Sequence, residues 1–125
     1  MNLLLDTHTV LWWLDDDSTL AQPARDAIAD PENTVFLSAI VIWEIRIKEA
    51  IGKVELPPEF RSVLDEQPFM HLPITVEHAH AVAELPPIHG DPFDRMLAAQ
   101  ARSERLIIAT RDAVFADYGV GVIAA

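Results

Sequence analysis

Short apolar runs alternate with amphipathic helical segments along this chain. The runs include NLLLD at residues 2–6, TVFLS at 34–38 and LIIAT at 106–110. Runs of this length and composition are typical of strands buried on both faces of a parallel sheet, where helices make the connections. The alternation therefore predicts an α/β fold, a three-layer sandwich with a mainly parallel sheet flanked by helices.

The segments between these strands carry helix-boundary signals. Weaker strands are expected at residues 69–72 and 120–123, and a length of 125 residues predicts a single domain, 1–125. In the helix that Thr75 caps, Val76, Ala79, Val82 and Ala83 are expected on the apolar side. The predicted helices cover 7–14, 23–30, the segment from the Ser38 cap to Gly52, 57–66, the segment after Thr75, and the segment after Asp91 with Phe93, Met96, Leu97 and Ala101 on its apolar face.

Composition excludes several classes of protein. The chain has no cysteine, so disulfide scaffolds, thiolate zinc sites and cysteine nucleophiles are excluded. No apolar run approaches the roughly 20 residues that span a bilayer, and the N-terminal segment lacks the basic start of a signal peptide, so we expect a cytoplasmic protein with no membrane contact.

The net charge of -11 argues against a protein that binds nucleic acid through a broadly basic surface. The bases are confined to short windows, so either a local positive rim or ordinary solvated helix faces fits the pattern. Most of them are Arg46, Lys48 and Lys53 in one window and Arg95, Arg102, Arg105 and Arg111 in another.

Several acids are expected at the carboxyl edge of the sheet, where ligands bind in open α/β folds. Asp6 ends the first strand, and Asp112 lies two residues beyond the LIIAT strand. The DPFD segment places Asp91 at a helix cap and Asp94 in the first turn. Each of these acids also has a structural explanation, because aspartate at a helix start accepts hydrogen bonds from free backbone N–H groups.

Glu44 allows two interpretations. In a helix, three of its four neighbours at spacings of three and four are apolar, namely Ile40, Val41 and Ile47. It is therefore either a buried carboxylate that needs a cation, or half of an exposed pair with Lys48. If these acids converge, they repel one another unless hard divalent cations neutralise them, and a Mg²⁺ or Mn²⁺ site is the natural solution.

The sequence resembles a PIN-domain ribonuclease of the VapC toxin type in four blocks that occur in the same order. The blocks are DTHTVLWWL, SAIVIWEIRIK, DPFDRMLAAQA, and TRD with Phe115 and Tyr118 downstream. The resemblance covers essentially the whole chain and implies a PIN-like sandwich. It implies a metal-binding catalytic site made by Asp6, Glu44, Asp94 and Asp112, with Asp91 as a further metal-binding acid and with the hydroxyls of Ser38 and Thr110 lining the site. Gly90 departs from the basic residue that many relatives carry there.

The resemblance also implies an activity and partners. The activity is metal-dependent endoribonucleolytic cleavage with Mg²⁺ or Mn²⁺, by the toxin of a VapBC-type pair. The partners are an RNA substrate, a cognate VapB-type antitoxin and a second copy in a homodimer. The alternative is a catalytically inert PIN-like module that binds RNA or protein. A phosphoacceptor receiver domain is disfavoured, because the first strand ends in one acid and no lysine follows the last strand.

Other candidate groups receive structural interpretations. No two histidines have the helical spacing of a metal site, so we expect surface or internally bonded histidines. Only His89 is near enough to Asp91 to support a metal ligand from outside. Trp12, Trp13 and Trp43 are expected in the core rather than on a base-stacking surface.

Overall fold

The computed structural model describes all residues 1–125, and a sheet of five strands lies at its centre. The strand order is β3-β2-β1-β4-β5, and every neighbouring pair is parallel. The predicted mainly parallel sheet is confirmed, and it is parallel throughout. The strands are β1 (Asn2–Leu5), β2 (Thr34–Ser38), β3 (Met70–Leu72), β4 (Ile107–Thr110) and β5 (Val122–Ala124).

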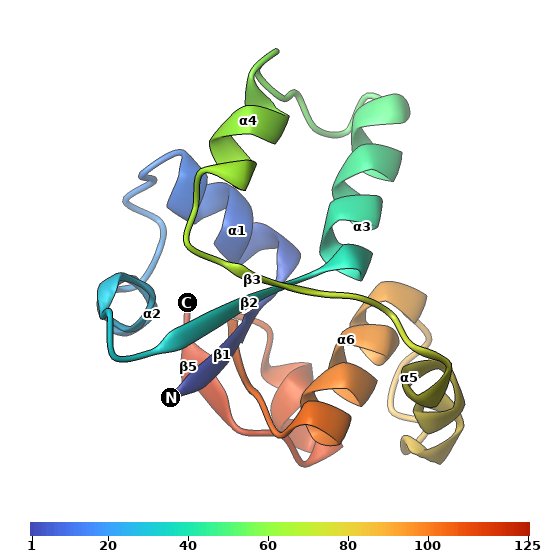
Figure 1. Cartoon of the computed structure of the whole chain (residues 1–125). Helices are drawn as coiled ribbons and strands as arrows, with labels where there is room; N and C mark the ends of the chain where they lie inside the picture. Colours follow the sequence, from blue (N-terminus) through green and yellow to red (C-terminus); the bar gives the residue numbers. More distant parts are fainter.

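Helices cover both faces of the sheet. Figure 1 shows α1 and α4 on one side and α5 and α6 on the other, which completes the predicted sandwich. None of the helices combines the length and apolar character needed to cross a membrane. The helices are α1 (Thr7–Leu14), α2 (Gln22–Ala29), α3 (Ala39–Ala50), α4 (Phe60–Asp65), α5 (Val76–Ala81) and α6 (Pro92–Glu104), with short 3-10 helices η1 (Val82–Glu84) and η2 (Ala113–Tyr118).

Side-chain caps start four of the helices where the sequence indicates them. Asp6, Ser38, Thr75 and Asp91 each accept a hydrogen bond from a backbone N–H in the first turn of α1, α3, α5 and α6 respectively. Each cap satisfies a donor that has no partner within its helix. These caps fix the direction in which each helix leaves the sheet.

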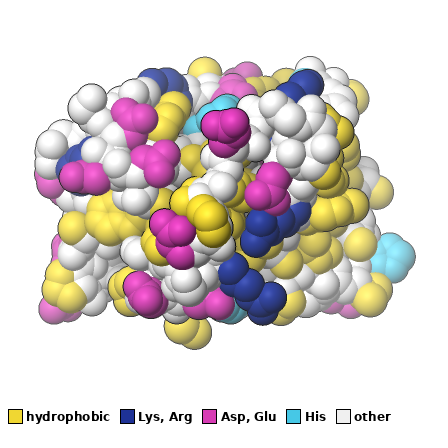
Figure 2. Space-filling view, turned by 90° about the horizontal axis from the view of Figure 1, so that it is seen from above, with side chains coloured by type: hydrophobic (Ala, Val, Ile, Leu, Met, Phe, Trp, Pro, Cys, Tyr) yellow, Lys and Arg dark blue, Asp and Glu magenta, His cyan; other side chains and the backbone are white.

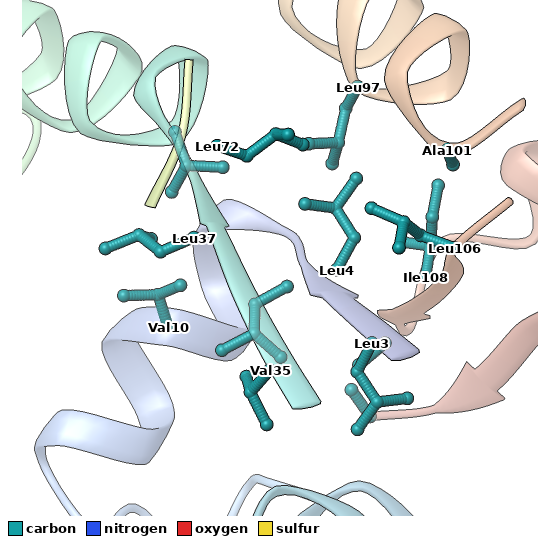
Figure 3. Packing of buried hydrophobic residues seen from close by; sticks show 14 of the residues in the cluster. Leu3, Leu4, Val10, Val35, Leu37, Leu72, Leu97, Ala101, Leu106 and Ile108 are labelled. Carbon is teal, nitrogen blue, oxygen red and sulfur yellow. The ribbon is translucent and has the colours of Figure 1, made fainter. Parts of the chain in front are cut away.

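The core is built on the alternating faces of the central strands. Figure 3 shows Leu4 and Ile108 pointing toward Leu97 of α6, whereas Val35 lies on the opposite face, toward α1. Leu4 and Ile108 are register partners on β1 and β4, and both are fully buried. A strand that is buried on both faces has no polar face, which explains why the NLLL run has no alternation.

Two predicted details of the helices are wrong. Helix α4 begins at Phe60, not at Pro57. Of the residues expected on the apolar side of the helix after Thr75, Val76 is 70% exposed and Ala79 and Ala83 are also exposed, whereas His78 is buried. His78 can be buried because its two ring nitrogens contact Gln100 and Glu104. Gln100 in turn accepts a hydrogen bond from the Ser38 hydroxyl. Such satisfied polar contacts remove the cost of burying an imidazole.

The strand order creates a crevice at one edge of the sheet. From β1 the chain proceeds through β2 to β3 on one side, and β4 and β5 are then added on the other side of β1. The strand order therefore reverses between the neighbouring strands β1 and β4. Their carboxyl ends form a topological switch point, which is where ligands bind in open α/β sheets. Helix α3 contacts both α1 and α6, so the crevice has helical walls.

Candidate carboxylate site

All five predicted acids line one cavity at this carboxyl edge. The cavity has a volume of about 130 Å³ and opens between α1, α3 and the start of α6. It is lined by Asp6, Thr7, His8, Ile40, Val41, Glu44, Lys48, Asp91, Phe93, Asp94, Leu97, Asp112 and Phe115. Carboxylates that are widely separated along the chain are therefore brought together by the fold.

Asp6 is held rigidly by two threonines. Its Oδ1 accepts hydrogen bonds from the Thr9 backbone N–H at 2.9 Å and from the Thr9 hydroxyl at 2.6 Å. Its Oδ2 accepts from the Thr110 hydroxyl at 2.5 Å, across the gap between β1 and β4. The helix-cap interpretation of Asp6 is thus correct, and it coexists with a position in the cavity wall.

Glu44 combines features of both interpretations. It is only 8% exposed, and its Oε1 accepts a hydrogen bond from the Thr7 hydroxyl at 2.6 Å. Its Oε2 lies 2.6 Å from the Lys48 ammonium one turn along α3. The carboxylate is therefore buried and also paired with the lysine, which offsets its desolvation.

Two acids meet at the start of α6. Asp91 caps the helix through Oδ1, which accepts from the backbone N–H groups of Phe93 and Asp94. Burial raises the pKa of Asp94 from 3.8 to about 6, and the charges of Asp91 and Glu44 add to this increase, while the hydrogen bond from His89 opposes it. Burial is therefore the main cause of the raised pKa, and repulsion from the neighbouring carboxylates adds to it.

His89 lies between Asp94 and Tyr118. Its Nε2 lies 3.3 Å from Asp94 Oδ2, and its Nδ1 forms a short contact with the Tyr118 hydroxyl. Arg95 donates to the same hydroxyl at 3.3 Å. His89 thus contacts Asp94, but the expectation that it is the only histidine near the acids is wrong, because His8 lines the cavity and stacks on Trp12.

Asp112 closes the cavity from the β4 side. It caps η2, because its Oδ1 accepts from the Val114 backbone N–H at 3.0 Å. Its own backbone N–H donates to the Thr110 hydroxyl, which also holds Asp6. One threonine therefore couples the two acids on either side of the switch point.

The donor set suits a hard divalent cation. Carboxylate oxygens are the ligands that Mg²⁺ and Mn²⁺ prefer, and such an ion would offset the repulsion that Asp91 and Glu44 exert on Asp94. No three acidic or histidine side chains are arranged in this structure as a ready coordination group. The protein's own donors hold several of the carboxylates in place, as described for Asp6 and Glu44.

Two sequence-based expectations around the site are wrong. The Ser38 hydroxyl does not line the cavity, because it is fully buried and bonds Gln100 beneath the start of α3. Trp43 is 58% exposed and is not a core residue. It contacts the ring of Phe93 edge-on, and both belong to an apolar groove of about 650 Å³ beside the cavity, together with Ile74, Val82 and Met96.

Sequence reasoning overlooked two members of the cavity wall. Thr7 and His8 follow Asp6 directly, and only the first turn of α1 turns them toward the acids. By contrast, the spacing of four residues between Glu44 and Lys48 indicated in advance that the lysine can pair with this acid. Figure 2 shows basic side chains next to acidic and apolar ones on this view of the surface, without one continuous positive area.

Comparisons with known proteins agree with this architecture. Residues 3–121 match the sequence profile of the PIN domain. One chain of VapBC2 from Rickettsia felis, solved bound to a promoter DNA fragment, shares 15% identity over 99% of this chain and 98% of that chain, with a TM-score of 0.75. No curated protein sequence matches the chain significantly.

Two further solved structures share the fold. A chain of VapBC-5 from Mycobacterium tuberculosis, a member of the VapBC family of toxin-antitoxin systems, is 20% identical over 98% of this chain and 96% of its own length, with a TM-score of 0.60. The PIN domain endonuclease Utp24 is 15% identical over 99% and 84%, with a TM-score of 0.61. With the profile spanning nearly the whole chain and the carboxylate cavity at the switch point of its parallel sheet, this chain belongs to the PIN domain family.

Proposed function

We propose that this protein is a metal-dependent endoribonuclease and the toxin of a VapBC-type toxin-antitoxin pair. The observation that carries the proposal is the convergence of five acids, from four distant parts of the chain, on one cavity at the sheet's switch point. Membership of the PIN family supports nuclease chemistry, and the description of Utp24 as an endonuclease supports cleavage within a chain.

Each acid has a role in this proposal. Asp6, Asp94 and Asp112 would hold the divalent ion, Glu44 would hold it or orient the attacking water, and Asp91 would be a further ligand. A bound Mg²⁺ or Mn²⁺ would lower the pKa of a water molecule and stabilise charge that develops on the phosphoryl and leaving oxygens.

Neighbouring side chains prepare these acids for the reaction. The Thr9 and Thr110 hydroxyls orient the Asp6 carboxylate in advance, which reduces the freedom it must lose when substrate binds. The apolar side chains of Ile40, Leu97 and Phe115 line the same cavity. They lower the local dielectric, which strengthens every electrostatic contact made there.

RNA cleavage by the purified protein tests the proposal. We expect the wild type to cut RNA with Mg²⁺ or Mn²⁺ and not with chelator, and Asp6→Asn to reduce the rate at least about 100-fold. Asparagine caps a helix as well as aspartate does, so the variant should fold. Asp26→Asn, at an exposed position on α2, is the matched control. Calorimetry that detects no Mn²⁺ binding, together with absent cleavage, would favour the inert RNA- or protein-binding module instead.

The proposed antitoxin needs a surface on this protein. The apolar groove beside the cavity exposes Trp43 and Ile74, and exposed apolar patches of this kind mark protein interfaces. Co-expression with the small gene next to its own should yield a complex that copurifies and cleaves RNA more slowly than the free protein. Copurification at background level in this experiment would contradict the pairing.

A homodimer is also part of the proposal. Leu11 and Leu14 of α1 line a second hollow of about 300 Å³ with Phe60 and Val63 of α4, and this apolar surface supports self-association.

A further inference from the structure

Lys48 has an unusual place in the cavity. It is the only lysine or arginine among the lining residues, and its side chain is 32% exposed. Its ammonium lies 2.6 Å from Glu44 Oε2, while the other oxygen of Glu44 accepts from Thr7. Both oxygens of this carboxylate are therefore engaged by the protein itself.

This arrangement sets Lys48 in competition with a divalent cation. An ion bound at Oε2 would share that oxygen with the lysine, and a dication in so small a cavity would repel the ammonium. Lysine carries its charge on a flexible stem with freely rotating bonds, so the ammonium can move away while the backbone of α3 stays in place.

A displaced Lys48 can pair with another anion. The proposed substrate brings a phosphodiester to the same cavity, and lysine binds phosphate as a mobile point charge. The other acids at the cavity are held by different donors: threonines hold Asp6, backbone N–H groups hold Asp91 and Asp112, and His89 contacts Asp94. Only Glu44 is paired with a side chain that can be exchanged in this way.

We propose that Lys48 is a built-in counterion that holds Glu44 in the metal-free protein and transfers to a substrate phosphate when a divalent ion binds. The transfer to a substrate phosphate rests on the proposed nuclease function. The competition between Lys48 and a divalent ion for Glu44 concerns metal binding alone, so it is measured without RNA.

The first measurement is a calorimetric titration with Mn²⁺ alone. Lys48→Gln should bind Mn²⁺ roughly threefold to tenfold more tightly than wild type, because the competing cation is gone. Arg46→Gln removes the same charge from the same helix, but Arg46 pairs with Glu49 outside the cavity, so its Mn²⁺ affinity should stay within about twofold of wild type. Equal Mn²⁺ affinities for Lys48→Gln and wild type would overturn the counterion role.

The second measurement is binding of a short single-stranded RNA in the presence of Ca²⁺, followed by fluorescence anisotropy. Lys48→Gln should bind it several-fold more weakly, with a salt dependence smaller by about one phosphate contact, and Lys48→Arg should restore most of the affinity. An unchanged affinity and salt slope would overturn the phosphate contact. Failure of the nuclease proposal alone gives a different result. In that case the wild type still binds Mn²⁺ and Lys48→Gln binds it more tightly, but neither protein cuts RNA.

Discussion

Replacing Asp94 with asparagine is expected to abolish RNA cleavage and to stabilise the metal-free protein at neutral pH. The rate with Mn²⁺ should fall at least about 100-fold, because the amide removes a negative charge from the proposed metal site. Asp117→Asn is the matched control, since Asp117 is exposed on η2 outside the cavity. Cleavage by Asp94→Asn at the rate of the control would contradict the assigned role.

The effect on stability follows from the raised pKa of Asp94. A carboxyl whose pKa in the folded protein is about 6, above its ordinary 3.8, favours the fold while it is protonated. That contribution is present below about pH 4 and is lost as the pH rises through 6. Above this range the ionised Asp94 destabilises the metal-free fold, because its charge is partly buried near other carboxylates. An uncharged asparagine does not have this effect.

Thermal unfolding at pH 4 and pH 8 in chelator measures this difference. Between these pH values, the unfolding free energy of Asp94→Asn relative to wild type should rise by about 1 kcal/mol, after allowance for solvent screening of this partly exposed group. The helix dipole of α6 favours the aspartate by about 0.5 kcal/mol at pH 8, so the net gain there is smaller than the change between the two pH values. A stability difference that does not vary with pH would contradict the raised pKa.

Leu4→Ala should produce the largest loss of stability. Leu4 is fully buried on the central strand β1 and packs toward α6, as Figure 3 shows. Truncation removes apolar contacts and leaves a cavity between sheet and helix, which typically costs about 3 kcal/mol, or a fall in Tm of about 10 °C.

Met70→Ala is the control for this substitution. Met70 lies on the edge strand β3 and is 56% exposed, so its truncation should change the unfolding free energy by less than about 0.5 kcal/mol. Denaturant unfolding followed by circular dichroism checks both variants. A Leu4→Ala protein as stable as Met70→Ala would show that β1 is not the centre of the core.

Local patterns in the sequence were sufficient to predict the strands and most helix starts. Residues 3–5 and 106–109 are apolar at every position because their strands are covered on both faces. Asp6 and Asp91 could be identified as caps, because capping depends on residues only two or three positions away. Their dual role as cap and cavity wall follows, since helix starts and strand ends meet at the same edge of a parallel sheet.

The same local reasoning failed where a side chain depends on a distant element. The apolar spacing in α5 indicated Val76 for the core, yet His78 is buried, because Gln100 and Glu104 on α6 supply its partners. The large apolar side chain of Trp43 predicts a core position, yet Trp43 is exposed and lines an open groove between α3 and α6. Neither outcome is encoded in the periodicity of one helix.

By itself, the sequence determined the parallel α/β class and put acids at the strand ends and helix starts, because backbone pairing and capping are governed by near neighbours. Only the tertiary structure decided that Thr110 holds Asp6 from 104 residues away, that Glu44 lies between Thr7 and Lys48, and that all five acids share one cavity. These contacts depend on the strand order and on the packing of α3 between α1 and α6, and packing between distant elements is set by the whole core at once.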